Sequence, residues 1–154
     1  QKIGLGAVVM SSVPMTDFAE AYNYEKAVEF LENGRPVVFA CGIGIPYIST
    51  DTAGVVRALE IGADVILMAK NVDGIYSVDP AVCSDAVRSR TISYKECLDA
   101  GLRATDASAS AIAMDSGIDT LVFSLREKNS IMNAVTGHNS GTLVTAANIE
   151  KIIY

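Results

Sequence analysis

The stretch "GIGIPYISTDTAG", residues 42–54, carries the residue types that a phosphate-binding loop needs. Gly42 and Gly44 have no side chains, so the backbone can turn tightly and bring N–H groups close to a ligand. Ser49 and Thr50 supply hydroxyl groups, and the N–H groups at the start of a following helix attract an anion. The same residues also suit an ordinary loop with a helix N-cap at Thr50 or at the aspartate that follows it. This stretch alone leaves both interpretations open.

A second polar stretch, "AKNVDGIYSVDP" at residues 69–80, combines Lys70, the ring of Tyr76 and the carboxylate of Asp79. In a functional interpretation, Tyr76 flanks a flat base and Asp79 accepts a hydrogen bond from an amine or hydroxyl. In a structural interpretation, Asp73-Gly74 forms a β-turn, the tyrosine packs on the sheet, and Asp79 fixes the turn before a proline. The sequence favours the structural interpretation, and one loop can satisfy both.

Two further polar residues have simple structural explanations. Asp106, within "GLRATDASAS", stands at an expected helix start, where a carboxylate is favourable as a cap. Ser108 is an alternative cap for this helix, and Gly117 is expected to end it. His138 is the only histidine and lies in a polar segment, so we expect it at the surface. A histidine-based nucleophile triad or a histidine-rich metal site has almost nothing to build on, and we expect no metal site formed by protein ligands alone.

The composition limits the classes of partner. The 18 acidic and 12 basic residues give a net charge of -6, which argues against general attraction to nucleic acid or to an anionic membrane. No apolar run reaches the ~20 residues that a membrane-spanning helix needs. The three cysteines have neither metal-ligand spacing nor an even count for disulfides. We therefore expect a soluble cytoplasmic protein without nucleic-acid or membrane partners.

Short apolar runs alternate with helical patterns along the chain, which is typical of an α/β fold with a mainly parallel sheet covered by helices. The chain has no linker or repeat, so we expect a single domain over residues 1–154. Residues 72–90 read as a hairpin turn followed by an exposed loop. The patterns predict strands at 3–10, 36–40, 64–69, 119–125 and 141–145, and helices at 24–34, within 50–63, and at 93–100, 106–116 and 129–137.

Several motifs in fixed order resemble the second half of the bacterial UMP kinases, which have the amino-acid kinase fold. The likeness runs from "GAVVMSSVPM" through "GRPVVFACGIGIPYISTDTAGVVRALEIGADVILMAKNVDGIYSVDP" and "TISYKECLDAGLRATDASASAIAMDSGIDTLVF" to "GTLVT". The resemblance implies a three-layer sandwich and transfer of the γ-phosphoryl group of ATP to UMP, with Mg²⁺ neutralising phosphate charge. It also implies a homo-oligomer, since these kinases typically assemble as hexamers.

The resemblance assigns roles by position. Asp106 matches an aspartate near the transferring phosphoryl group, and Asp51 follows the UMP-contacting loop at the start of a helix. We take both as candidate catalytic residues. Lys70, Tyr76 and Asp79 match positions that line the ATP site around adenine and ribose. The loop that contacts UMP in the family corresponds to Ile43, Gly44, Ile45, Pro46, Tyr47, Ile48, Ser49 and Thr50.

The chain departs from the family pattern in three respects. Ile43 and Ile45 replace the threonine and asparagine of the usual Gly-Thr-Gly-Asn-Pro, which leaves backbone contacts but removes two polar side chains. Lys70 stands where an uncharged polar residue is common, and Met68 where a lysine is often found. The chain begins at Gln1 within an expected strand, without the family's N-terminal half and its phosphate-binding loops.

The third departure predicts that the 154-residue chain alone has little or no kinase activity, whereas the full-length protein is active. An alternative is a nucleotide-binding or regulatory domain of the same fold that does not transfer phosphate, which the two isoleucines favour. A kinase of the same fold that acts on a carboxylate or carbamate would need a different acceptor pocket. The pairing of "PYISTD" with "VDGIYSVDP" favours the nucleotide kinase over that third possibility.

Overall fold

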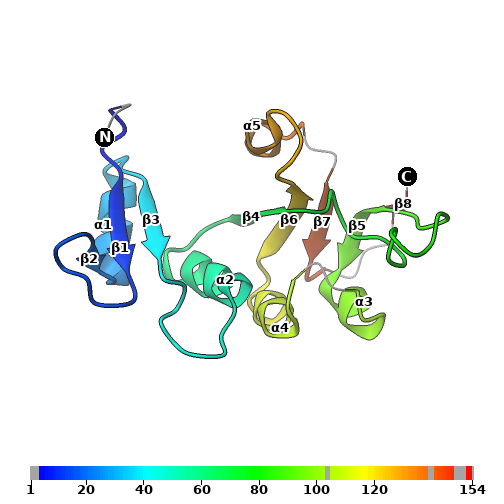
Figure 1. Ribbon diagram of the computed structural model, residues 1–154, viewed down its shortest axis with the longest axis horizontal. Helices are drawn as coiled ribbons and strands as arrows, with labels where there is room; N and C mark the ends of the chain where they lie inside the picture. Colours follow the sequence, from blue (N-terminus) through cyan, green and yellow to red (C-terminus); the bar gives the residue numbers. More distant parts are fainter. Residues whose placement is uncertain (1–3, 103–104, 139–140, 148–151, 154) are drawn as a thin grey trace. The chain divides into compact units, whose positions relative to one another are not determined.

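The computed structural model describes residues 4–102, 105–138 and 141–147, together with the backbone of 152–153. The chain forms two compact units, residues 1–63 and 64–154. Figure 1 labels the helices and strands of both. The expectation of one domain over the whole chain stays a prediction.

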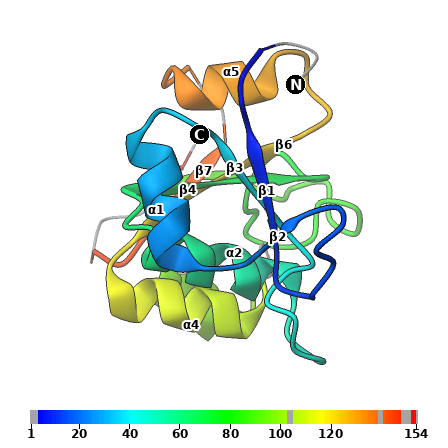
Figure 2. The ribbon, with the colours of Figure 1, turned by 90° about the vertical axis from the view of Figure 1, so that its left-hand side faces the viewer.

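The first unit is built on a three-stranded parallel sheet in the order β2-β1-β3. Val8 and Met10 of β1 are buried against Ala27 of α1, with Phe30 and Phe39 packed around them. Val9 points to the opposite face and is exposed, as strand alternation requires. Figure 2 shows α1 beside this sheet. The elements are β1 (Val8–Ser11), β2 (Glu20–Ala21), α1 (Tyr24–Glu32), β3 (Val37–Ala40) and α2 (Thr50–Glu60).

The second unit is built on a five-stranded mixed sheet in the order β4-β6-β7-β5-β8. Strand β4 runs parallel to β6, and β5 runs parallel to β7, while β6 and β7 are antiparallel. Helices α3 and α4 lie side by side (Figure 1). The elements are β4 (Val65–Lys70), β5 (Ser89–Ser93), α3 (Tyr94–Asp99), α4 (Ala107–Ser116), β6 (Asp119–Ser124), α5 (Ser130–Val135), β7 (Thr142–Thr145) and β8 (Ile152–Ile153).

Side-chain caps define where α3 and α4 begin in the second unit. Ser93 and Glu96 form a capping box at α3, in which each side chain bonds the backbone N–H of the other. Asp106 caps α4 by accepting a 2.9 Å hydrogen bond from the N–H of Ala109. Gly117 ends α4 with φ 73°, a left-handed conformation that glycine adopts without strain. The expected start at Asp106 and end at Gly117 are therefore confirmed.

The α/β class and its mainly parallel pairing are confirmed, but several boundaries differ from the expectation. The first strand begins at Val8, because Gly4 and Gly6 have φ of 76° and 61°, outside the strand region; residue 3 lies outside the described residues. Residues 89–93 form β5, although they were expected to end an exposed loop and begin a helix. Two short strands, β2 and β8, were not expected.

A hairpin does form within residues 72–90, but the position of its turn differs from the expectation. Residues 75–77 pair with residues 87–89, through a bridge between Tyr76 and Arg88 and a 2.9 Å bond from the N–H of Ser77 to the carbonyl of Val87. The connecting segment is 78–86, so the hairpin is not closed by Asp73-Gly74 as expected, although the chain does bend at these two residues.

The capping box makes a stability prediction. Ser93→Ala should lower the free energy of unfolding by about 1 kcal/mol, because it leaves the N–H of Glu96 without its cap. Ser116→Ala is the matched control, since its exposed hydroxyl only donates to the carbonyl of Ile112 and should have almost no effect. Denaturant unfolding of the full-length protein measures both, and equal stabilities of the two variants would contradict the assignment.

Candidate functional site

The loop of residues 41–49, here called the acceptor loop, connects β3 to α2 through left-handed backbone. Cys41, Gly42, Gly44 and Tyr47 have φ of 65°, 59°, 76° and 68°. The N–H of Gly44 donates to the carbonyl of Cys41 over 3.2 Å and closes a four-residue turn. The sequence expectation of a tight glycine turn between a strand and a helix is confirmed.

The N-cap of the helix after the acceptor loop lies one or two residues earlier than expected. Ser49 is the N-cap of α2, and its hydroxyl accepts a 3.1 Å hydrogen bond from the N–H of Thr52. The expected caps, Thr50 and Asp51, are instead the first two helical residues. An acidic residue in this first turn interacts favourably with the helix dipole.

Most side chains of the acceptor loop face solvent. Tyr47 is fully exposed, Ile45 is 60% exposed and Ile48 is 43% exposed, while Ile43 is half-buried. Pro46 is exposed as well. The polar groups that this loop presents in its first half are therefore those of the backbone.

A buried cluster behind the acceptor loop was missed by the sequence reasoning. Arg57 of α2 is buried, and its Nη2 donates a 2.9 Å hydrogen bond to the hydroxyl of Ser12. Ser12 in turn donates to the carbonyl of Gly42 over 2.8 Å. Arg57 also forms a 2.5 Å ion pair with Glu60, and its guanidinium lies 3.4 Å from the centre of the Tyr22 ring. Only the fold brings these residues together, because they are up to 45 positions apart.

Tyr22 completes the cluster. Its hydroxyl donates to the carboxylate of Glu60. Burial, followed by this hydrogen bond, raises the pKa of Tyr22 to about 12. The phenol therefore stays protonated at neutral pH.

The second unit contains a cavity of about 370 Å³, here called the donor cavity. This volume lies within the range of small-molecule sites, ~300–1,000 Å³. Tyr76 and Asp79, two of the residues expected at an ATP site, both line it. Lys70 ends β4 and Asp106 caps α4, and neither is part of the lining. The other lining residues are Val72, Gly74, Ile75, Val78, Pro80, Gly101 and Leu102.

A polar network holds the ring of Tyr76. Its hydroxyl lies 2.9 Å from Oδ1 and 3.1 Å from Oδ2 of Asp73, whose carboxylate forms a 2.8 Å ion pair with Arg88. Burial, followed by the hydrogen bond to Asp73, raises the pKa of Tyr76. The sequence reasoning named Asp73 only as part of a turn and did not name Arg88.

Asp79 has the structural role that the sequence favoured. Its Oδ1 accepts a 2.9 Å hydrogen bond from the N–H of Ala81 and fixes the turn around Pro80. Its side chain also lines the donor cavity, so the structural and functional interpretations are compatible.

Gly74, which lines the donor cavity, lies close to Thr142 and Arg88. A Cβ at Gly74 would lie 2.5 Å from Oγ1 of Thr142 and 2.8 Å from Cδ of Arg88. Thr142 accepts a 2.9 Å bond from the N–H of Ile75 and donates a 2.5 Å bond to the carbonyl of Ser89. Gly74 is thus required by packing, because any side chain would collide with β7 or Arg88.

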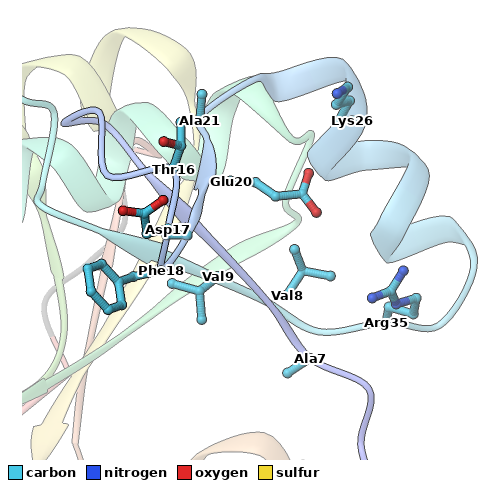
Figure 3. A pocket seen from close by; sticks show the side chains of 11 residues that line it. Ala7, Val8, Val9, Thr16, Asp17, Phe18, Glu20, Ala21, Lys26 and Arg35 are labelled. Atoms are coloured by element: carbon cyan, nitrogen blue, oxygen red, sulfur yellow. The ribbon is translucent and has the colours of Figure 1, made fainter.

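A cavity of about 650 Å³ in the first unit contains none of the expected site residues. Figure 3 shows Lys26 and Arg35 on one side of it and Asp17 and Phe18 on the other, with Glu20 between them. His138 is exposed, as expected, with Nδ1 3.1 Å from the hydroxyl of Thr136. Within the described ranges, no helix is long and apolar enough to cross a membrane, and no three His, Cys, Asp or Glu residues are grouped as metal ligands.

Residues 1–124 match the model of the amino acid kinase family. The chain is 48% identical to the uridylate kinase of Mycolicibacterium vanbaalenii, with 94% of this chain and 58% of that protein covered. The uridylate kinase of Mycobacterium leprae is also 48% identical, with 94% and 57% covered. The chain spans less than three fifths of the length of these two relatives.

Solved structures agree with these sequence matches. UMP kinase from Bacillus anthracis has a TM-score of 0.90 at 32% identity, with 96% of this chain and 60% of that chain covered. UMP kinase from Ureaplasma parvum has a TM-score of 0.89 at 28% identity, with 94% and 62% covered. The chain therefore belongs to the amino acid kinase family and has its α/β fold.

The acceptor loop makes a prediction at Gly44. A Cβ there would lie 3.0 Å from the carbonyl oxygen of Ser12, and φ is 76°. Gly44→Ala should therefore lower the free energy of unfolding by about 1–3 kcal/mol, because both the backbone and the contact become strained. Gly54→Ala in α2 is the matched control, since an added Cβ would meet no atom within 4 Å apart from its chain neighbours and the helix's own backbone. It should stabilise by about 0.5–1 kcal/mol. Opposite signs are expected in thermal or denaturant unfolding, and equal effects would contradict the described loop.

Proposed function

We propose that this chain is part of a UMP kinase, which transfers the γ-phosphoryl group of ATP to UMP and yields UDP and ADP. The observation that carries the proposal is the donor cavity, where Tyr76 and Asp79 share one lining. The names of the relatives, uridylate kinase and UMP kinase, support the same activity.

Phosphoryl transfer depends on alignment and on stabilisation of charge more than on covalent chemistry with the protein. In the proposed mechanism, the acceptor loop binds UMP mainly through backbone N–H groups, with Ser49 and Thr50 at the helix start. The ring of Tyr76 stacks on adenine, and Asp79 accepts a hydrogen bond from the ribose. Lys70 lies at the end of β4, where its charge would favour an ATP phosphate.

Asp106 and Asp51 are the proposed carboxylates near the transferring group. Asp106 is the N-cap of α4, and Asp51 lies in the first turn of α2. Mg²⁺ usually takes only one or two protein carboxylates and is otherwise bound by phosphates and water, so these single aspartates fit that pattern. The ion would neutralise charge on the phosphates.

We further propose that the longer protein is a cytoplasmic homo-oligomer. The three cysteines form no disulfide, which is in keeping with a reducing compartment. On α5, Ile131, Met132 and Val135 expose 57%, 64% and 66% of their surface, which is in keeping with a helix that meets another subunit or another part of the protein.

A second candidate function is nucleotide binding without phosphoryl transfer. It is favoured by Ile45, which places an apolar, 60% exposed side chain in the acceptor loop. Turnover separates the two, because a kinase forms UDP at steady state and a binding domain does not.

Steady-state UDP formation by the full-length protein tests the kinase proposal. Tyr76→Ala should raise KM for ATP about tenfold or more, because stacking of a base on an aromatic ring contributes ~1–3 kcal/mol. Asp79→Asn should also raise it, since a carboxylate accepts stronger hydrogen bonds than an amide. KM for UMP should stay nearly unchanged in both variants. Lys95→Ala, which breaks an exposed ion pair on α3, is the control and should match the wild type.

Unchanged ATP kinetics in both cavity variants would contradict the assignment of the donor cavity. The 154-residue chain assayed alone is expected to give little or no UDP. Rates like those of the full-length protein would refute the proposal that the additional phosphate-binding groups are needed.

A further inference from the structure

We infer that Arg57 is a positioning residue for UMP, acting through Ser12 on the backbone of the acceptor loop. This inference rests on the proposed function. Arg57 touches no reacting atom in this scheme, and its effect reaches the ligand only through the direction of one peptide group.

A chain of hydrogen bonds joins Arg57 to Gly42 through Ser12. Nη2 of Arg57 lies 2.9 Å from Oγ of Ser12, and that hydroxyl donates to the carbonyl oxygen of Gly42 over 2.8 Å. A hydroxyl has one proton and can accept as well, so the arginine donation directs the single proton of Ser12 toward Gly42. The carbonyl of Gly42 is therefore held in one direction.

The geometry of the peptide group fixes the direction of the N–H of Ile43. The peptide between Gly42 and Ile43 is planar and trans, so its N–H points opposite to its C=O. Because the carbonyl faces Ser12, the N–H of Ile43 faces away from it. Gly42 has φ 59° and could adopt other conformations at small cost, so the hydrogen bond is what selects this one. Position 43 is an isoleucine, where the family usually has a polar side chain. At this position the loop can therefore contact a ligand through a polar group only with this backbone N–H.

Arg57 itself is held in one position by its surroundings. Its guanidinium is fixed from three sides, by the 2.5 Å ion pair with Glu60, by the ring of Tyr22 at 3.4 Å and by Ser12. The arginine is only 7% exposed, so its position is set by packing and by these contacts. The planar, permanently charged guanidinium group can bond Glu60 and Ser12 at the same time. A lysine ammonium at the same place could not reach both in the same geometry.

Kinetics of the full-length protein test the inference. Ser12→Ala removes the link to Gly42 and leaves the Arg57–Glu60 pair intact, so it should lower kcat/KM for UMP about tenfold while KM for ATP changes less than about twofold. Arg57→Met should have at least the same effect on UMP, and Arg57→Lys should recover part of it. Ser116→Ala on α4 is the matched control for Ser12→Ala, because its exposed hydroxyl only donates to the carbonyl of Ile112 and lies outside the Arg57 cluster. It should leave the UMP kinetics near those of the wild type.

Hydrogen exchange gives a readout that does not depend on turnover. Amides of residues 41–49 should exchange faster in Ser12→Ala than in the wild type, while those of β4 should not change. Faster exchange together with unchanged kcat/KM for UMP would overturn the role in UMP positioning. Unchanged exchange would overturn the hydrogen-bond link, even if Arg57→Met fails to fold. A wild-type protein that forms no UDP would instead contradict the proposed function, and the exchange result would still decide the link.

Discussion

Both candidate nucleotide sites depend on one constraint. The backbone N–H and C=O groups of the loops that follow two strands must point in fixed directions. In the first unit, Gly44 passes so close to Ser12 that an added Cβ would lie 3.0 Å from its carbonyl oxygen. In the second unit, Gly74 passes close to Thr142 in the same manner. Each glycine lets a loop lie directly against a neighbouring segment, so the loop backbone is held by contacts and not by its own conformational preference. Phosphoryl transfer depends on preorganised groups of this kind.

Polar side chains behind each loop fix its backbone through hydrogen bonds. Thr142 satisfies the N–H of Ile75 and the carbonyl of Ser89, and thereby joins the donor cavity to β5 and β7. Arg57 and Ser12 do the equivalent for the acceptor loop. A buried polar group that loses its partner costs more free energy than an ordinary hydrogen bond contributes, so these supports constrain the loops strongly.

The sequence predicted the parts of the fold that follow from local pattern. The α4 cap at Asp106 and its end at Gly117 were predictable, because a carboxylate and a glycine mark helix ends by their own chemistry. Strand β5 was not, because "SRTIS" is polar, although Ser89 and Ser93 are buried. The cap at Ser49 was placed one or two residues late, since serine, threonine and aspartate stand together there and all are good caps.

The residues of the candidate sites also divide into those that the sequence predicted and those that it did not. Tyr76 and Asp79 were predictable from motif position and do line one cavity. Arg57, Ser12 and Arg88 were not, because their roles come from contacts between residues 15 to 45 positions apart. Spacing within a single helix or loop carries no signal for such pairs.

Hydrogen exchange of the full-length protein, with each nucleotide added separately, tests the central claim that one chain provides an acceptor loop and a separate donor cavity. UMP should slow exchange in residues 41–52 and leave residues 72–82 unchanged, whereas a non-hydrolysable ATP analogue should do the reverse. Protection of the same segment by both nucleotides, or of neither segment by either, would contradict the account.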